Sequence, residues 1–125
     1  MRLIIAVAAL SSFASLAFAA DLEHGAKVFK KCSTCHMVGP GAASRVGPPL
    51  NGLFGRKSGT YEGYSYTDAN KNSGITWDDA TFAKYIKDPK GMIPGTKMVF
   101  AGLPEEADVV DLAAFLKQYK ADGSK

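Results

Sequence analysis

The chain has 125 residues, of which 46% are hydrophobic, and it carries a formal net charge of +3 at pH 7. This length suits a single domain, and the charge is far below that of domains that bind nucleic acid through a basic surface. We therefore expect one folded domain and no nucleic-acid partner.

A secretory signal peptide is predicted at residues 1–19. Arg2 supplies a positive charge before an apolar stretch, and Ala17-Phe18-Ala19 matches the small-x-small pattern that signal peptidase cleaves. A retained membrane anchor is the alternative, but the apolar stretch is shorter than the roughly 20 residues that a spanning helix needs. We expect cleavage, which lowers the net charge from +3 to +2 because Arg2 is lost, and a single soluble domain over residues 20–125 in the periplasm.

The first helix of the mature domain is predicted over residues 21–31, where Leu22 and Phe29 share an apolar face. Gly25 lies inside this helix, at a cost of about 1 kcal/mol relative to alanine. A glycine at this position suggests that another helix approaches closely. His24 falls on the polar face, and we expect it to be an exposed surface histidine.

Both cysteines of the chain lie in the segment Cys32-Ser33-Thr34-Cys35-His36, which is the pattern that attaches haem covalently. Two thiols at this spacing can add to the two vinyl groups on one side of the porphyrin. The next residue, a histidine, is then placed beneath the iron. The motif predicts one covalently attached haem c, held by Cys32 and Cys35, with His36 as the proximal iron ligand.

Paired cysteines have other uses, and three of them compete with haem attachment. A thioredoxin-like dithiol needs a βαβ scaffold, and the chain shows no strand-rich pattern. A structural zinc site needs four ligands, and only His24 remains beyond the motif. A plain disulfide is possible but leaves His36 without a role.

The segment from residue 39 to residue 63 is rich in glycine and proline and has neither helical nor strand periodicity. A loop of this length is unusual inside a small domain. It becomes reasonable if the loop wraps a large apolar group, and a bound macrocycle would serve. The loop therefore agrees with the haem prediction.

Two helical segments are predicted after this loop. Residues 66–71 could form one or two turns. A clearer helix covers residues 76–87, with Thr76 as N-cap, Asp79 three residues later in a variant of the capping box, and Pro89 as the residue that stops it.

The last helix is predicted to begin with Pro104 in its first turn. Its buried face comprises Val109, Leu112, Ala113 and Leu116. Because little of the chain reads as strand, we expect an all-α fold with three to five helices and long loops around one covalently attached haem.

The second axial position of the iron has two candidate ligands. Met37 follows His36 directly and cannot reach the opposite face of the haem. Met92 and Met98 are both compatible by distance along the chain, and core packing is the more common role of a methionine. The residues alone leave this choice open.

From about residue 25 to residue 119, the chain resembles the mitochondrial cytochromes c and the bacterial cytochromes c2. The matching blocks are residues 32–36, 47–48, 52–59, 66–72, 74–77 and 93–102. The resemblance implies the small cytochrome c fold and one-electron transfer. It also implies that Met98, in the Pro-Gly-Thr-Lys-Met block, is the second axial ligand, and that Met92 is a packing residue.

The same resemblance implies roles for residues around the haem. Pro48 would offer its carbonyl to the imidazole of His36. Residues expected near the haem propionates are Arg56, Tyr66 and Trp77, and those expected in the polar network around the methionine ligand are Asn70, Tyr85 and Thr96. An apolar lining is expected from Leu50, Leu53, Phe100 and Leu116.

The expected function is that of a monomeric periplasmic shuttle and not an enzyme, because no acid–base pair or substrate pocket is evident. The resemblance implies a quinol-oxidising cytochrome bc complex as donor and a terminal oxidase or photosynthetic reaction centre as acceptor. Membrane contact would occur only through these partners. Lysines that flank the haem motifs are expected to form the docking ring: Lys31, Lys57, Lys87, Lys90 and Lys97.

Two departures from the mitochondrial pattern make this face less basic, namely Gly91-Met92 and Pro104-Glu105-Glu106.

Two rival functions would need an open iron. One is a peroxidase, and the other is a sensor of carbon monoxide or nitric oxide. An intact Met98 ligand disfavours both.

Overall fold

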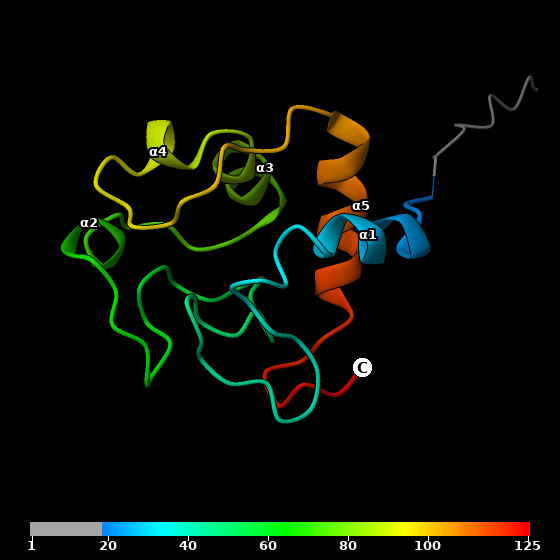
Figure 1. The fold of residues 1–125 in the computed structure, drawn as a ribbon, viewed down its shortest axis with the longest axis horizontal. Helices are drawn as coiled ribbons and strands as arrows, with labels where there is room; N and C mark the ends of the chain where they lie inside the picture. The colour runs from blue at the N-terminus through cyan, green and yellow to red at the C-terminus, as the bar shows by residue number, and fades with distance from the viewer. Residues whose placement is uncertain (1–18) are drawn as a thin grey trace, which may run out of the picture.

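The computed structural model describes residues 19–125, so the predicted signal peptide lies outside the described residues except for Ala19. Five helices occur in the described part: α1 (Leu22–Phe29), α2 (Asp68–Lys71), α3 (Asp79–Lys87), α4 (Pro89–Met92) and α5 (Glu106–Lys117) (Figure 1). Strand-like pairing within residues 19–125 is limited to one antiparallel bridge between Lys57 and Thr76. The predicted all-α class is therefore confirmed.

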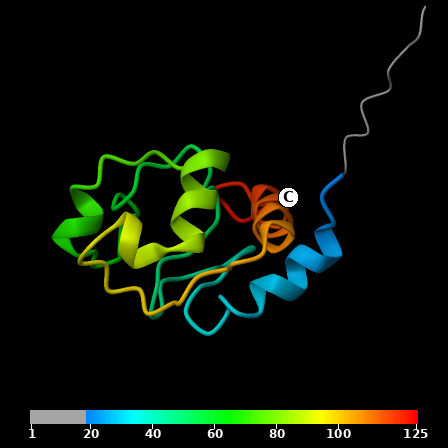
Figure 2. The same cartoon turned by 90° about the horizontal axis from the view of Figure 1, so that it is seen from above.

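Helices α1 and α5, from the two ends of the domain, pack against each other (Figures 1 and 2). Gly25 makes this crossing possible, because a Cβ at this position would lie 2.2 Å from the carbonyl oxygen of Asp111. Next to the crossing, the rings of Phe29 and Phe115 have centroids 5.3 Å apart. The predicted close approach of a second helix at Gly25 is confirmed.

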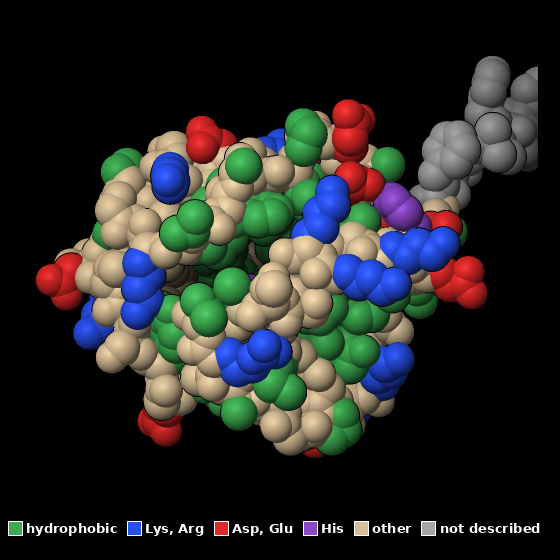
Figure 3. Space-filling view, in the orientation of Figure 1, with side chains coloured by type: hydrophobic (Ala, Val, Ile, Leu, Met, Phe, Trp, Pro, Cys, Tyr) green, Lys and Arg blue, Asp and Glu red, His purple; other side chains and the backbone are tan. Residues whose placement is uncertain are grey.

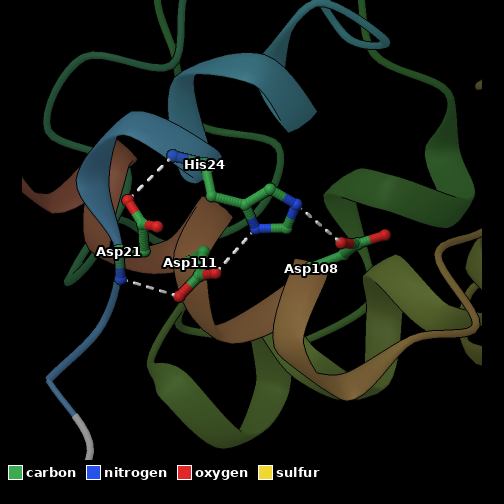
Figure 4. A network of polar contacts seen from close by, with 4 residues as sticks. All are labelled: Asp21, His24, Asp108 and Asp111. Atoms are coloured by element: carbon green, nitrogen blue, oxygen red, sulfur yellow. Dashed lines mark hydrogen bonds and ion pairs between the residues drawn. The ribbon is translucent and has the colours of Figure 1, made fainter.

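A polar network closes the same crossing near the start of α1 (Figure 4). The Nδ1 atom of His24 lies 2.7 Å from a carboxylate oxygen of Asp111, and its Nε2 atom lies 3.3 Å from Asp108. The backbone N–H of Asp21 donates to the other oxygen of Asp111 at 2.9 Å. The prediction of an exposed His24 is wrong, because these contacts with α5 leave the residue half-buried.

Helix α3 begins later than the sequence predicts. Its N-cap is Asp78, whose carboxylate accepts from the backbone N–H of Thr81 at 2.8 Å, while the Thr81 hydroxyl accepts from the backbone N–H of Asp78 at 2.9 Å. The prediction of Thr76 as N-cap, with Asp79, is wrong because Thr76 pairs with Lys57 in the antiparallel bridge. This pairing holds Thr76 outside the helix.

Proline has a different role at the next two helix boundaries. Pro89 follows the end of α3 and is also the first residue of the short helix α4. Asp88 caps α4, because its carboxylate accepts a hydrogen bond from the backbone N–H of Gly91. Pro104 precedes the N-cap of α5, Glu105, and is not in the first turn as predicted. The predicted buried face of α5 is confirmed.

The core joins α3 and α5 to the segments around them. Its most buried large apolar side chains belong to Leu103, Val109, Leu112 and Leu116. Long loops leave this core and surround a cavity on one side of it, as the predicted loop over residues 39–63 requires. No helix within residues 19–125 combines the length and apolar character that a membrane crossing requires.

Candidate functional site

A cavity of about 250 Å³ lies between α3, α5 and the loops (Figure 3 shows its mouth as a hollow lined by hydrophobic side chains). Every residue that the sequence predicts for the site lines this one cavity: Cys32, Cys35, His36, Pro48, Arg56, Tyr66, Asn70, Trp77, Tyr85, Thr96 and Met98. The predicted apolar lining of Leu50, Leu53, Phe100 and Leu116 is also present. The fold thus brings together residues that are up to 84 positions apart, from Cys32 to Leu116 (116 − 32 = 84).

The turn after α1 presents the two cysteines and the histidine to the cavity. Backbone N–H groups of Cys35 and His36 both donate to the carbonyl of Cys32, at 3.0 Å and 2.9 Å. This tight turn places the thiols and the imidazole on the same wall. Within residues 19–125 of this structure, no disulfide joins Cys32 to Cys35.

The environment of Cys32 also argues against a redox dithiol. Burial, together with the neighbouring Cys35, raises the pKa of the Cys32 thiol to about 11. Reactive dithiols instead depend on a lowered thiol pKa, because the thiolate is the nucleophile. The raised pKa of Cys32 therefore disfavours thiol exchange at this residue.

The imidazole of His36 is held by two contacts. Its Nδ1 atom lies 2.7 Å from the carbonyl oxygen of Pro48 and donates a hydrogen bond to it. Gly47 packs against the ring, because a Cβ at this position would lie 2.3 Å from Cε1 of His36. The hydrogen bond fixes the tautomer with a proton on Nδ1 and leaves Nε2 free to bind a metal.

Burial favours the same neutral form of His36. Desolvation lowers the pKa of this imidazole, although the hydrogen bond to the Pro48 carbonyl opposes the shift. Neutral imidazole is the form that ligates metals. Both the orientation and the charge state of His36 therefore suit an axial ligand.

Met98 also faces the cavity and is held by its neighbours. The hydroxyl of Tyr85 lies 3.4 Å from the sulfur of Met98 and donates to it, and the backbone N–H of Met98 donates to the Thr96 hydroxyl at 3.3 Å. The hydroxyls of Tyr85 and Thr96 are 3.5 Å apart. Met92 does not line the cavity but packs against the core.

Arg56 supplies a half-buried cation to the cavity wall. Its guanidinium donates to the carbonyl of Pro49 from two nitrogens at 3.2 Å and to the carbonyl of Asn51 at 3.4 Å. None of the four ion pairs formed within residues 19–125 includes Arg56. Burial lowers the pKa of this guanidinium, which an anionic group in the cavity would counteract.

The residues present therefore fit a covalently attached haem. Two thiols lie beside an imidazole, a thioether faces the same space, the lining is largely apolar, and a cation is available for carboxylate groups. Tyr66 is next to this cation, and its hydroxyl accepts from the backbone N–H of Tyr61 at 3.2 Å. Imidazole and thioether groups are the axial ligands of haem in the cytochromes c.

Sequence reasoning missed several residues at the cavity mouth. Tyr64 lines the cavity and contacts Tyr66 edge to face, with ring centroids 4.8 Å apart. The spacing of two residues in Tyr64-Ser65-Tyr66 is the signal that could have revealed it, because extended backbone places alternate side chains on one side. Val46 and Val99 also line the mouth and are 71% and 91% exposed.

The five predicted docking lysines do not occupy equivalent places. Lys31 and Lys97 line the cavity, whereas Lys57, Lys87 and Lys90 are exposed but do not line it. Lys87 is also ion-paired with Glu106. Figure 3 shows basic side chains around the hollow on this face.

Comparison with known proteins agrees with this site. The family model described as "Cytochrome c" matches residues 22–120. A cytochrome c2 of Blastochloris viridis is 56% identical over 124 residues, covering 99% of this chain and 98% of its own length. A cytochrome c2 of Rhodoplanes tepidamans is 62% identical over 105 residues, covering 84% of this chain and 98% of its own length.

The structural comparison gives the same result. Cytochrome cH from Methylobacterium extorquens has a TM-score of 0.73 and 42% sequence identity, covering 78% of this chain and 98% of its own. The chain belongs to the cytochrome c family, whose members carry one covalently attached haem c and are electron carriers, not enzymes.

Proposed function

We propose that this protein is a soluble periplasmic one-electron carrier in which Cys32 and Cys35 attach the haem and His36 and Met98 bind its iron. The observation that carries the proposal is that all four side chains line one cavity, although Met98 is 62 residues after His36 (98 − 36 = 62). When bound, the haem supplies an iron that gains or loses one electron. The protein supplies the ligands, their orientation and the exclusion of water.

The residues around the ligands suit this task. The carbonyl of Pro48 fixes the His36 ring, and the hydroxyls of Tyr85 and Thr96 hold the Met98 side chain and backbone. Histidine and methionine ligation raises the reduction potential, and an apolar surrounding acts in the same direction because the oxidised iron carries the extra charge. With two protein ligands in place, the coordination of the iron has to change little when an electron is gained or lost.

Replacing Met98 with alanine tests the ligand assignment, and replacing Met92 with alanine is the matched control. We expect the ferric Met98→Ala protein to lose the weak methionine–iron absorption band and its ferrous form to bind carbon monoxide. Met92→Ala should retain the band and bind no carbon monoxide, because Met92 packs against the core and does not line the cavity. The reverse result would assign the ligand to Met92. An open iron in the unmodified protein would favour the peroxidase or sensor function.

We further propose that a cytochrome bc complex is the electron donor and that a terminal oxidase or photosynthetic reaction centre is the acceptor. Lys31 and Lys97 are the best supported docking residues, because both are exposed and line the cavity mouth. Lys57 and Lys90 are retained as outer members of the ring. Lys87 should contribute less, because Glu106 partly neutralises it.

A salt titration tests the docking proposal. Exposed charges steer association strongly at low ionic strength, and the effect falls as salt rises. We expect reduction by a purified cytochrome bc complex to slow with salt and Lys31→Gln to lower the low-salt rate more than Lys125→Gln does. Equal rates for the two variants would remove Lys31 from the docking surface.

Export to the periplasm is supported by the pattern of residues 1–19. Mass spectrometry of protein from the periplasm should give the mass of residues 20–125 plus one haem. A retained N-terminus would contradict cleavage.

A further inference from the structure

Tyr64 connects two segments of the cavity mouth that are far apart in the sequence. Its hydroxyl donates to the carbonyl oxygen of Val46 at 2.8 Å. Val46 is followed by Gly47, which packs on the ring of His36, and by Pro48, which accepts the hydrogen bond from that ring. The Tyr64 hydroxyl therefore holds the backbone that supports the imidazole.

The ring of Tyr64 makes a second connection on the methionine side. The ammonium group of Lys97 lies 4.6 Å from the centroid of this ring, and it also donates to the carbonyl oxygen of Ser65. Lys97 directly precedes Met98 in the chain. A cation held over an aromatic face is attracted to it, and this attraction restrains the backbone on either side of Lys97.

We propose that Tyr64 is a positioning residue that ties the segment supporting His36 to the segment bearing Met98 and so restrains opening of the cavity. The inference rests on the proposed function, in which these two residues bind the iron. The edge-to-face contact with Tyr66 fixes the ring between its two partners. Opening at Met98 then requires the contact between Lys97 and Tyr64 to break as well.

The hydroxyl and the ring can be separated by mutation of the haem-containing protein. Tyr64→Phe keeps the ring and removes only the hydrogen bond to Val46. Tyr61→Phe is the matched control, because Tyr61 lies three residues away and its hydroxyl forms no hydrogen bond within residues 19–125. Lys97→Gln removes the cation and leaves the hydroxyl of Tyr64 in place.

The first measurement is the rate at which saturating imidazole displaces the methionine ligand, followed by loss of the methionine–iron absorption band. We expect this rate to rise about fivefold in Tyr64→Phe, as for loss of one neutral hydrogen bond. It should also rise in Lys97→Gln and stay within about twofold of the unmodified protein in Tyr61→Phe. Equal rates in Tyr64→Phe and Tyr61→Phe would overturn the role of the hydroxyl.

Hydrogen exchange provides a second measurement that general destabilisation would not reproduce. The backbone N–H of Gly47 donates to the carbonyl of Cys35 at 2.9 Å and should exchange faster in Tyr64→Phe. Amides in the middle of α5 should be unchanged. Faster exchange at α5 to the same extent would overturn the proposal, because it would indicate a loss of global stability.

The two proposals fail in different ways. If the unmodified protein lacks the methionine–iron band, the assignment of Met98 as a ligand is wrong. The contacts of Tyr64 then cannot control dissociation of Met98 from the iron. If the band is present but Tyr64→Phe matches Tyr61→Phe in the rate of methionine displacement, only the role of Tyr64 is overturned.

Discussion

Gly25→Ala tests the packing of α1 against α5, because two physical effects predict changes in protein stability of opposite sign. Alanine is favoured over glycine inside a helix by about 1 kcal/mol, so an exposed glycine would be replaced with a gain in stability. At Gly25, however, the new Cβ would lie 2.2 Å from the carbonyl oxygen of Asp111 and 2.8 Å from Cβ of Phe115. The backbone oxygen cannot move without shifting α5.

The expected change follows from these two terms. Overpacking of a rigid contact costs about 1–3 kcal/mol, and this contact should be near the upper end because it involves backbone. Subtracting the gain in helix propensity leaves a loss of about 2 kcal/mol in the free energy of unfolding. For a domain of about 100 residues, this corresponds to a fall in Tm of roughly 10 °C.

Guanidinium unfolding of the haem-containing protein, followed by circular dichroism, measures this difference. Lys27→Ala is the control, because Lys27 is an exposed residue of the same helix and its replacement should change stability by less than about 0.5 kcal/mol. A Gly25→Ala protein that is as stable as the unmodified protein, or more stable, would refute the proposed helix contact.

Two further predictions concern α5. Hydrogen bonds from the backbone N–H of Asp21 and from His24 lower the pKa of Asp111, so its ionised form contributes stability that is lost as the pH falls below about 4. Asp111→Asn should therefore flatten the loss of stability in acid, which thermal melts between pH 3 and pH 6 can measure, and an unchanged slope would contradict this. Leu112→Ala should lower the free energy of unfolding by about 2–5 kcal/mol, because this side chain is only 1% exposed, and a loss below about 1 kcal/mol would contradict its place in the core.

The chemistry of the site could be read from the sequence because its strongest signals are local. The two thiols and the imidazole lie in five consecutive residues, and their spacing matches the haem-attachment pattern. The second axial position could not be assigned in this way, because Met92 and Met98 are both compatible by distance along the chain. The family resemblance implied Met98, and the fold places Met98, but not Met92, in the lining of the cavity.

Errors in the prediction arose where tertiary contacts override local preference. Thr76 has the character of a good N-cap, but its pairing with Lys57 transfers this role to Asp78. His24 falls on a polar helix face, and nothing local indicates that two carboxylates of α5 lie beside it. For Tyr64, the spacing to Tyr66 could have indicated a place in the cavity wall, but not the hydrogen bond to Val46, which is 18 residues away.

The absorption spectrum of the unmodified protein, made in a periplasm with haem-attachment machinery, tests the central claim most directly. We predict sharp low-spin c-type bands in the reduced state, the weak methionine–iron band in the oxidised state and no change on addition of carbon monoxide. A high-spin iron that binds carbon monoxide readily would contradict the closed His36–Met98 site, and protein without covalently attached haem would contradict the roles of Cys32 and Cys35.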